Sequence, residues 1–435
     1  MLIDLSHNEL RGPIPQSISN LVNLTLLDLS SNNLSGVVEL QTFSNLKSLD
    51  FLNLGFNLIQ GPLPVPPPSV SGFLFSQNKL TGEIPSSICN VSSLSILDLS
   101  HNHLSGAIPQ CLGNFSNILF VLDLRFNAFQ GNISMIFGKE LQVLVLRSNK
   151  FHGPIDTSKP KLYFPKLRIV DLSHNKFTGH LPGRYFKIFK AMRYKTMPNE
   201  KYLSVGSYYQ GSIMVTMKGL DYYLTRILTI FTVIDLSSNK FSGEIPSSIC
   251  NVSSLSVLDL SHNHLSGTIP QCLGYFSNVL FVLDLQFNAF QGIIPLIFAK
   301  GNKLQSLNLN GNQFEGPVPQ SLTNCRQLQV LDLGNNKING TFPYWLGTLP
   351  NLQALILRSN KFHGPIDTSK PKLPFPKLRI FDLSHNKFNG HLPGRYFKIF
   401  KAMRYKTMPN EKYLSVGSYY QVEIFQMSSE GLILS

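Results

Sequence analysis

One sequence pattern, LxLxxNxLxGxIP, recurs along almost the whole chain of 435 residues. It reads LDLSSNNLSG at residues 27–36, LDLSHNHLSGAIP at residues 97–109 and LDLGNNKINGTFP at residues 331–343. The motif asparagines are 21–26 residues apart, except for one interval of 64 residues. A repeat of this length predicts a solenoid, in which each copy forms one coil and packs against its neighbours. These asparagines are Asn8, Asn32, Asn57, Asn78, Asn102, Asn127, Asn149, Asn175, Asn239, Asn263, Asn288, Asn312, Asn336, Asn360 and Asn386.

Each part of the motif predicts one part of a coil. The L-x-L alternation predicts a short strand whose leucines, such as Leu97 and Leu99, fill the core. The residues beside them, such as Ile96, Ser100 and His101, are expected to face outward on the concave side. The asparagine amide is expected to bond backbone groups of neighbouring coils and to form a ladder. Glycine then allows a tight bend, and Ile-Pro closes the coil.

The predicted fold class is α/β. We expect a leucine-rich-repeat solenoid, either a right-handed superhelix or a horseshoe. A parallel β-sheet should line the concave face, and short 3₁₀ or helical turns should follow the convex face. The L-x-G-x-I-P half of the motif resembles the plant extracellular subclass of leucine-rich repeats, over roughly 90% of the chain. This resemblance implies a second short strand in each coil and a twisted superhelix.

The long interval between Asn175 and Asn239 contains a segment without the motif, residues 182–231. This segment resembles the non-repeat island of plant receptor-like protein ectodomains. The flanking sequences LRSNKFHGPI and LTIFTVIDLSSNKFSGEIP resemble the tomato leaf-mould and Verticillium resistance receptor-like proteins. The predicted domains are a block of about eight repeats at 1–181, the island at 182–231, a block of about seven repeats at 232–394, and a truncated second island with a divergent tail at 395–435.

The chain also contains a duplication. Residues 79–131 match residues 240–292 with seven differences, and residues 141–210 match residues 352–421 with five. The sequence opens inside a strand, MLIDLSHN, without an apolar leader, and no apolar stretch is long enough to span a bilayer. We therefore expect an ectodomain fragment with an internal duplication. Full-length members of the family that it resembles reside at the plasma membrane and face the extracellular space.

The net charge of +14 is concentrated in two segments. Residues 159–201 and their copy, residues 370–412, each carry eleven Lys or Arg and two acidic residues. Two interpretations remain open: a solvated basic surface, and a docking site for an acidic partner or a polyanion. A nucleic-acid partner is not expected, because no binding motif accompanies the charge.

The five cysteines and the glycosylation sequons leave further alternatives. Cys89 and Cys111 lie in successive coils, as do Cys250 and Cys272. Either each pair forms a disulfide or the thiols are free and buried. Cys325 is expected to be a small buried apolar residue. The candidates for N-glycosylation, in N-x-[ST] sequons, are Asn23, Asn33, Asn90, Asn114, Asn132, Asn251 and Asn339.

Catalytic chemistry is not expected from this sequence. It contains no phosphate-binding loop, nucleophile elbow or kinase signature, and no cysteine–histidine spacing typical of zinc. An aspartate recurs once per coil, which indicates a structural row rather than a catalytic pair. The histidines of the SHN motifs are expected to face solvent. We therefore expect neither an enzyme nor a metal or cofactor site.

Binding is expected on the concave face, which solenoids use for recognition. Aromatic side chains beside arginines are typical of binding hot spots. The candidate ligand-binding residues are Arg125, Phe126, Arg147, Arg168, Phe287, Arg358 and Arg379.

Three functions follow from these patterns. The resemblance implies a ligand-recognition ectodomain of a plant cell-surface receptor-like protein, which senses a protein or peptide ligand in defence or peptide perception. Such proteins signal through partner receptor kinases, which would dock on the island and the last repeats. The alternatives are a truncated or recombined gene product without activity, and a secreted protein like the polygalacturonase inhibitors, which share the repeat.

Overall fold

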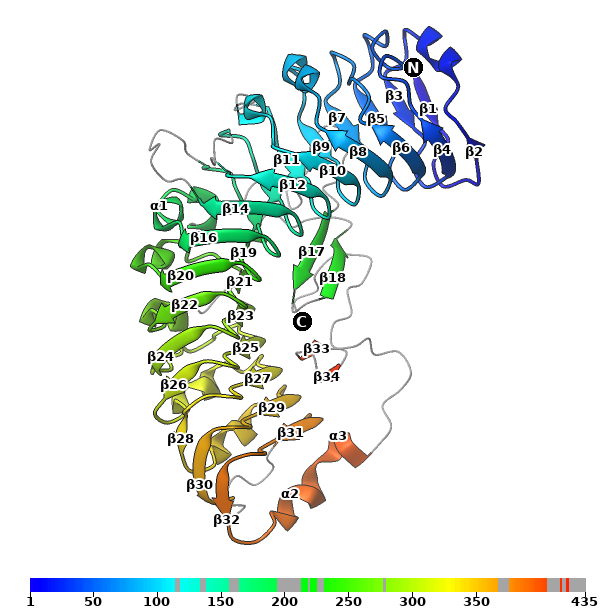
Figure 1. Cartoon of the computed structure of the whole chain (residues 1–435). Helices are drawn as coiled ribbons and strands as arrows, with labels where there is room; N and C mark the ends of the chain where they lie inside the picture. Colours follow the sequence, from blue (N-terminus) through cyan, green and yellow to red (C-terminus); the bar gives the residue numbers. More distant parts are fainter. Residues whose placement is uncertain are drawn as a thin grey trace. The chain divides into compact units, whose positions relative to one another are not determined.

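The computed structural model describes residues 1–113, 118–133, 138–155, 164–193, 213–217, 220–224, 231–276, 279–366, 375–404, 415–416 and 420–421. The chain forms two compact units, and the division falls between Ala191 and Met192. This division lies inside the segment that the sequence predicted to be a non-repeat island. Each unit is a stack of repeated coils (Figure 1).

In both units every L-x-L pair lies in or beside a three-residue strand, and these strands form the L-x-L sheet of the unit. Neighbouring strands are parallel and in register, so that Leu97 lies beside Leu122. In the first unit the strands follow the chain order β1 (Leu2–Asp4), β3 (Leu26–Asp28), β5 (Phe51–Asn53), β7 (Gly72–Leu74), β9 (Ile96–Asp98), β11 (Val121–Asp123), β13 (Val143–Val145) and β15 (Ile169–Asp171). In the second unit they are β19 (Val233–Asp235), β21 (Val257–Asp259), β23 (Val282–Asp284), β25 (Ser306–Asn308), β27 (Val330–Asp332), β29 (Ala354–Ile356) and β31 (Ile380–Asp382).

A second strand follows in each coil, as the L-x-G-x-I-P motif implied. In the first unit these strands are β2 (Arg11–Gly12), β4 (Asn33–Val37), β6 (Leu58–Pro62), β8 (Lys79–Glu83), β10 (His103–Gly106), β12 (Ala128–Gly131), β14 (Lys150–Pro154) and β16 (Lys176–His180). In the second unit they are β20 (Lys240–Glu244), β22 (His264–Gly267), β24 (Ala289–Ile293), β26 (Gln313–Glu315), β28 (Asn339–Gly340), β30 (Lys361–Pro365) and β32 (Lys387–Asn389). The predicted leucine-rich-repeat solenoid is thereby confirmed.

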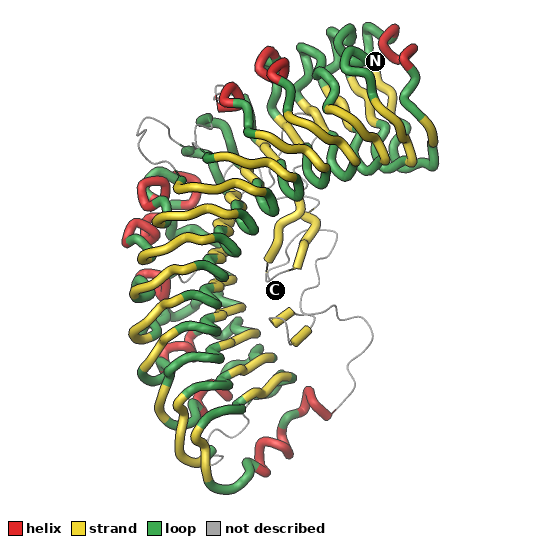
Figure 2. Tube along the Cα trace, viewed as in Figure 1, coloured by secondary structure: helices red, strands yellow, loops and turns green. Residues whose placement is uncertain are grey.

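Short 3₁₀ turns follow the second strand in many coils, on the side away from the L-x-L strands (Figure 2). They are η1 (Gln16–Asn20), η2 (Ser86–Asn90), η3 (Gln110–Gly113), η4 (Lys190–Met192), η5 (Ser247–Asn251), η6 (Gln271–Tyr275), η7 (Gln320–Asn324) and η8 (Tyr344–Thr348). Two antiparallel hairpins lie outside the repeats: β17 (Ile213–Met217) with β18 (Leu220–Leu224), and β33 (Ser415–Val416) with β34 (Tyr420–Gln421).

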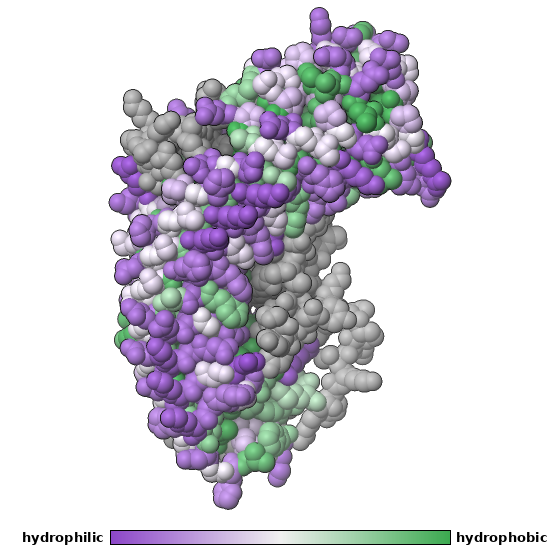
Figure 3. Space-filling model, in the orientation of Figure 1, coloured by the Kyte–Doolittle hydropathy of each residue, from purple (hydrophilic) through white to green (hydrophobic). Residues whose placement is uncertain are grey.

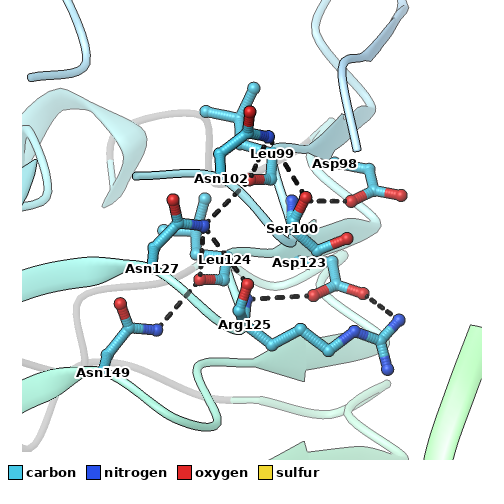
Figure 4. A network of polar contacts seen from close by, with 9 residues as sticks. All are labelled: Asp98, Leu99, Ser100, Asn102, Asp123, Leu124, Arg125, Asn127 and Asn149. Atoms are coloured by element: carbon cyan, nitrogen blue, oxygen red, sulfur yellow. Dashed lines mark hydrogen bonds and ion pairs between the residues drawn. The ribbon is translucent and has the colours of Figure 1, made fainter. Parts of the chain in front are cut away.

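The asparagine ladder forms as predicted, and Asn102 illustrates its bonds. Its Nδ2 donates to the carbonyl oxygens of Leu99 and Ser100 in its own coil, at 3.2 and 3.1 Å, and of Phe75 in the preceding coil, at 2.9 Å. Its Oδ1 accepts from the backbone N–H of Leu80 at 2.9 Å. One buried side chain therefore satisfies backbone groups in two coils, and Figure 4 shows the same arrangement at Asn127.

The residue before each ladder asparagine is left-handed in every coil, with φ between 51° and 66°. His101 (φ 54°) and Phe126 (φ 51°) are examples. This conformation costs roughly 1–2 kcal/mol for a residue with a Cβ. One coil has glycine at this position, Gly311, and none has a β-branched residue. The position was not recognised from the motif, although the absence of Val, Ile and Thr is a signal for it.

The two copies of the island start form equivalent helices: α1 (Gly183–Phe186) in the first unit, and α2 (Gly394–Ile399) followed by α3 (Lys401–Arg404) in the second. Tyr185 packs edge-on against Phe164, with ring centroids 5.7 Å apart. Its counterpart Tyr396 is fully buried and packs edge-on against Phe375 at 5.8 Å. Helices α1 and α2 therefore each add an aromatic ring to the core of the coil that precedes them.

The first coil contacts a neighbour on one side only, because β1 pairs with β3 alone among the described strands. Leu2, Leu5 and Leu10 are consequently exposed. Figure 3 shows apolar side chains gathered on the coils nearest the N-terminus. Later coils bury the equivalent leucines completely, such as Leu99 in place of Leu5 and Leu104 in place of Leu10. Stacking of neighbours thus supplies most of the apolar burial of a coil.

Candidate ligand-binding surface

A row of aspartates ends the L-x-L strands and stabilises the turns that follow. Asp98 Oδ1 accepts the backbone N–H of Ser100 at 3.0 Å, and Asp284 Oδ1 accepts that of Gln286 at 3.0 Å. Burial raises the pKa of Asp123 and that of Asp284 to about 7. The structural row predicted from the sequence is therefore present, and its members bond backbone groups of their own turns.

In the first unit, three side chains from successive coils stack beyond the ends of the L-x-L strands. The ring of His101 lies against Phe126, with centroids 4.4 Å apart and planes 26° apart. The guanidinium carbon of Arg147 lies 5.9 Å from the centroid of Phe126, in a cation–π arrangement. Arg147 also donates through Nη1 to Ser173 Oγ at 2.9 Å, and Ser173 Oγ donates to Asp171 Oδ1. The structure thus brings the candidates Phe126 and Arg147 together.

The second unit repeats this pair of rings without the arginine. His262 lies against Phe287 with centroids 4.7 Å apart. The next coil has Gly311, where a Cβ would lie 2.7 Å from Phe287 Cδ1. The ring of Phe287 therefore rests over a glycine, and 45% of the residue is exposed. Phe287 is the most open of the candidate residues.

Two arginines are buried, Arg125 and Arg147, so the prediction that they face outward as exposed side chains was wrong. Arg125 is 6% exposed and Arg147 is 9% exposed. Arg125 forms an ion pair with Asp123 at 2.6 Å, which Figure 4 shows beside the asparagine ladder. Ile96 and Ser100, also expected outside, are each 2% exposed. Parallel strands in register place equivalent side chains side by side, so an outward residue can be covered by its neighbours.

The remaining arginine candidates are half-buried. Burial lowers the pKa of Arg168 below its ordinary value. Burial raises the pKa of Asp332, and the positive charge of nearby Arg358 opposes this shift by favouring the charged aspartate. Arg379 donates its backbone N–H to the carbonyl of Gln353 at 2.7 Å. These side chains line the L-x-L sheets, but the described contacts do not join them into one cluster.

The paired cysteines lie at bonding distance in both copies. Cys89 and Cys111 form a disulfide with Cα atoms 5.5 Å apart, and Cys250 and Cys272 form one with Cα atoms 5.7 Å apart. Each bond joins two successive coils on the side of the 3₁₀ turns. Cys325 is a buried free thiol, and burial raises its pKa to about 12. An un-ionised buried thiol behaves as a small apolar residue.

The sequons differ in their surroundings. Five of the candidate asparagines are exposed, namely Asn23, Asn33, Asn90, Asn132 and Asn339. Asn251 is half-buried, and Asn114 lies outside the described residues.

Within the described ranges, no group of three or more His, Cys, Asp or Glu side chains is placed to hold a metal ion. The helices of the described part are too short to cross a bilayer.

Comparisons with known proteins match the repeats. Models described as "Leucine rich repeat" match residues 1–59 and 318–362, and also residues 93–115, 166–186, 231–252, 254–276, 303–325 and 377–397. Receptor-like protein 35 of Arabidopsis thaliana is 37% identical over 299 residues, covering 57% of this chain and 30% of that protein. Receptor-like protein 34 of the same organism is 46% identical over 179 residues, covering 40% of this chain and 18% of that protein. The chain thus spans less than a third of the length of either relative.

Solved structures of receptor ectodomains have the same fold. The Arabidopsis receptor kinase HAESA, in complex with the peptide hormone IDA and the co-receptor SERK1, aligns with a TM-score of 0.74 and 30% identity, covering 92% of this chain and 60% of that chain. The PEPR1–AtPEP1 structure aligns with a TM-score of 0.72 and 28% identity, covering 91% of this chain and 53% of that chain. Repeat motif, coil geometry and family models agree: the chain belongs to the leucine-rich-repeat proteins, and it is similar to receptor-like proteins of Arabidopsis thaliana.

Proposed function

We propose that this chain is a ligand-recognition part of a plant cell-surface receptor. It would bind a peptide or protein along its L-x-L sheets, in defence or peptide perception, and would signal together with partner receptor kinases. The similarity to HAESA, whose structure contains a peptide hormone and the co-receptor SERK1, supports this proposal. A role for the island and the last repeats in docking the kinase is part of the same proposal.

The exposed ring of Phe287 is the observation on which the choice of binding surface rests. Phe287 is nearly half exposed although it lies beside the L-x-L sheet, and its ring is held in place by His262 and by the backbone of Gly311. A fixed, exposed aromatic ring loses little conformational entropy on binding, which is why such rings are frequent hot spots. The surface around Phe287 therefore suits the apolar side chain of an extended peptide.

The test is a binding titration of the secreted chain against a panel of synthetic plant secreted peptides and pathogen-derived peptides. A peptide that binds should lose at least tenfold in affinity, about 1.4 kcal/mol, when Phe287 is changed to Ala. Leu296→Ala is the matched control, because Leu296 is 55% exposed in the same unit but follows β24 rather than an L-x-L strand. Equal affinities for the wild-type chain and both variants would remove Phe287 from the binding surface.

Association with a partner receptor kinase is tested by a separate measurement. The secreted chain should associate with the ectodomain of a partner receptor kinase more strongly when the bound peptide is present, as judged by size-exclusion chromatography of the mixture. Association with a panel of such ectodomains that is unaffected by the peptide would contradict a signalling role for ligand binding.

A further inference from the structure

One glycosylation sequon occurs twice in identical local sequence. The segment SSICNVSSL lies at residues 86–94 and at residues 247–255, with sequons that begin at Asn90 and Asn251. In both copies the asparagine ends a 3₁₀ turn, η2 or η5, and follows a disulfide-bonded cysteine. The sequence is therefore identical, and both copies form the same turn, although ψ of the next residue is 91° at Val91 and 49° at Val252. The main difference between the two sites lies in what packs against them.

Arg193 contacts both polar side chains of the second sequon. Its Nη2 donates to Asn251 Oδ1 at 2.8 Å, and its carbonyl oxygen accepts from Ser253 Oγ at 3.0 Å. Asn251 Nδ2 in turn donates to the carbonyl oxygen of Ser248 at 3.0 Å. We refer to Arg193, Asn251 and Ser253 as the sequon latch. All three residues belong to the second unit.

Backbone contacts hold the latch in place. The carbonyl oxygen of Met192 accepts from the N–H of Ser254 at 2.9 Å, so residues 192 and 193 lie along the end of η5. The charge-assisted bond from a guanidinium is stronger than a bond between neutral groups. Asn251 is consequently half-buried, with bonds to both its oxygen and its nitrogen.

The first sequon lacks such a cover. Asn90 is exposed whereas Asn251 is half-buried, and within the part of the chain that the structure describes no side chain bonds the Asn90 amide. The serines of both sequons, Ser92 and Ser253, are exposed. The coil that precedes η2 is an ordinary repeat, whereas η5 is preceded by the island start. The duplication has therefore placed the same sequon in an open and in a closed position.

N-glycosylation requires access to two atoms of the sequon. The asparagine Nδ2 attacks the anomeric carbon of a lipid-diphosphate oligosaccharide. A C–N bond forms, the sugar–phosphate C–O bond breaks, the lipid diphosphate leaves, and the amide loses one proton. The hydroxyl two residues later must be free to assist recognition. In the second sequon Arg193 bonds the Asn251 Oδ1 and the Ser253 hydroxyl, and the Asn251 Nδ2 donates to the carbonyl oxygen of Ser248.

We propose that the sequon latch keeps Asn251 unglycosylated in the folded chain, whereas Asn90 carries a glycan. This inference rests on the proposed cell-surface function, because only the secretory pathway supplies the glycan donor. The proposal implies that a glycan on Asn251 Nδ2 and the bond from Arg193 to Asn251 Oδ1 do not occur together. The glycan occupancy of Asn251 therefore reports whether Arg193 contacts Asn251 and Ser253.

The test expresses the full chain behind a cleavable secretion leader in plant cells and measures glycan occupancy of both sequons by peptide mass spectrometry. Occupancy should be several-fold higher at Asn90 than at Asn251. Arg193→Ala should raise occupancy at Asn251 towards that at Asn90, while Arg193→Lys should raise it less. Equal occupancy of the two sequons in the unaltered chain, or an unoccupied Asn90, would overturn the proposal.

A second measurement does not involve a glycan. In the chain treated with N-glycosidase, Asn251→Ala should speed tryptic cleavage after Arg193, whereas Asn90→Ala should leave its rate unchanged. Equal rates for both variants would refute the latch. Because the leader imposes entry into the secretory pathway, these results do not depend on the route of the native chain. A native chain without any glycan in plant tissue would count against the proposed function alone.

Discussion

The ladder asparagines should contribute strongly and locally to stability, and Asn102→Ala tests this. Three carbonyl oxygens lose a bond in this variant, but each keeps another: Phe75 O still accepts from Asn78, and Leu99 O from Asn127. Ser100 O still accepts a backbone N–H. The N–H of Leu80 alone loses the partner on which it depends. A buried unpaired N–H costs about 1–3 kcal/mol, so we expect about 2–3 kcal/mol in total.

Native-state hydrogen exchange resolves this effect to one coil, which is necessary because a solenoid can open locally. The amide of Leu80 should exchange far faster in Asn102→Ala, while amides of the second unit should keep their protection. Asn8→Ala is the control, because Asn8 is exposed and bonds only carbonyls of its own coil. If Asn102→Ala lowers the free energy of opening no more than Asn8→Ala does, the ladder does not join neighbouring coils.

Three further perturbations follow from the second unit. Replacing both Cys250 and Cys272 by Ala should destabilise it by about 3 kcal/mol in the chain-entropy model, and non-reduced peptide maps should show the bond in the unaltered chain. Gly311→Ala should destabilise the unit by about 1–2 kcal/mol through its left-handed φ. The control Gly301→Ala has a left-handed φ too, but its new Cβ would meet no neighbour, whereas that of Gly311→Ala would meet Phe287; Gly311→Ala should therefore destabilise more. Burial raises the pKa of Asp284 to about 7, so the folded unit retains a proton that the unfolded chain releases near 3.8. The free energy of unfolding, measured in urea titrations, should therefore fall as the pH rises from about 4 to about 7. The variant Asp284→Asn should show a flatter dependence on pH.

The repeat period was sufficient to predict the strands, the ladder and the aspartate row. All of these depend on interactions within a coil or between equivalent positions of successive coils. Asn102 bonds Phe75 and Leu80 because a fixed period brings the same motif positions together. The left-handed residue before the asparagine follows the same logic, and its restricted residue types could have revealed it.

The burial of individual outward side chains could not be predicted in the same way. The period gives the direction of a side chain but not the depth at which its charged end lies. Arg125 and Arg147 point away from the leucine core, yet one pairs with Asp123 in its own turn and the other reaches Ser173 in the next coil. Such contacts depend on the lengths and charges of particular neighbours, which vary from coil to coil.

The duplication provides a comparison between two versions of one surface. Both units hold a histidine against a phenylalanine, but the next coil supplies Arg147 in the first unit and Gly311 in the second. The arginine occupies one side of Phe126, and that residue is only half-exposed. Phe287 has no side chain beside it at the glycine and is more open.

This difference predicts unequal roles for the two aromatic rings. If a peptide binds by covering an exposed ring, Phe287→Ala should weaken binding more than Phe126→Ala, because less apolar surface is available for burial at Phe126. Phe126→Ala should mainly lower stability, since it removes the ring between His101 and Arg147. Affinity and hydrogen-exchange protection measured on the same two variants separate these effects. A larger loss of affinity at Phe126 would show that the ligand uses the arginine-flanked surface of the first unit instead.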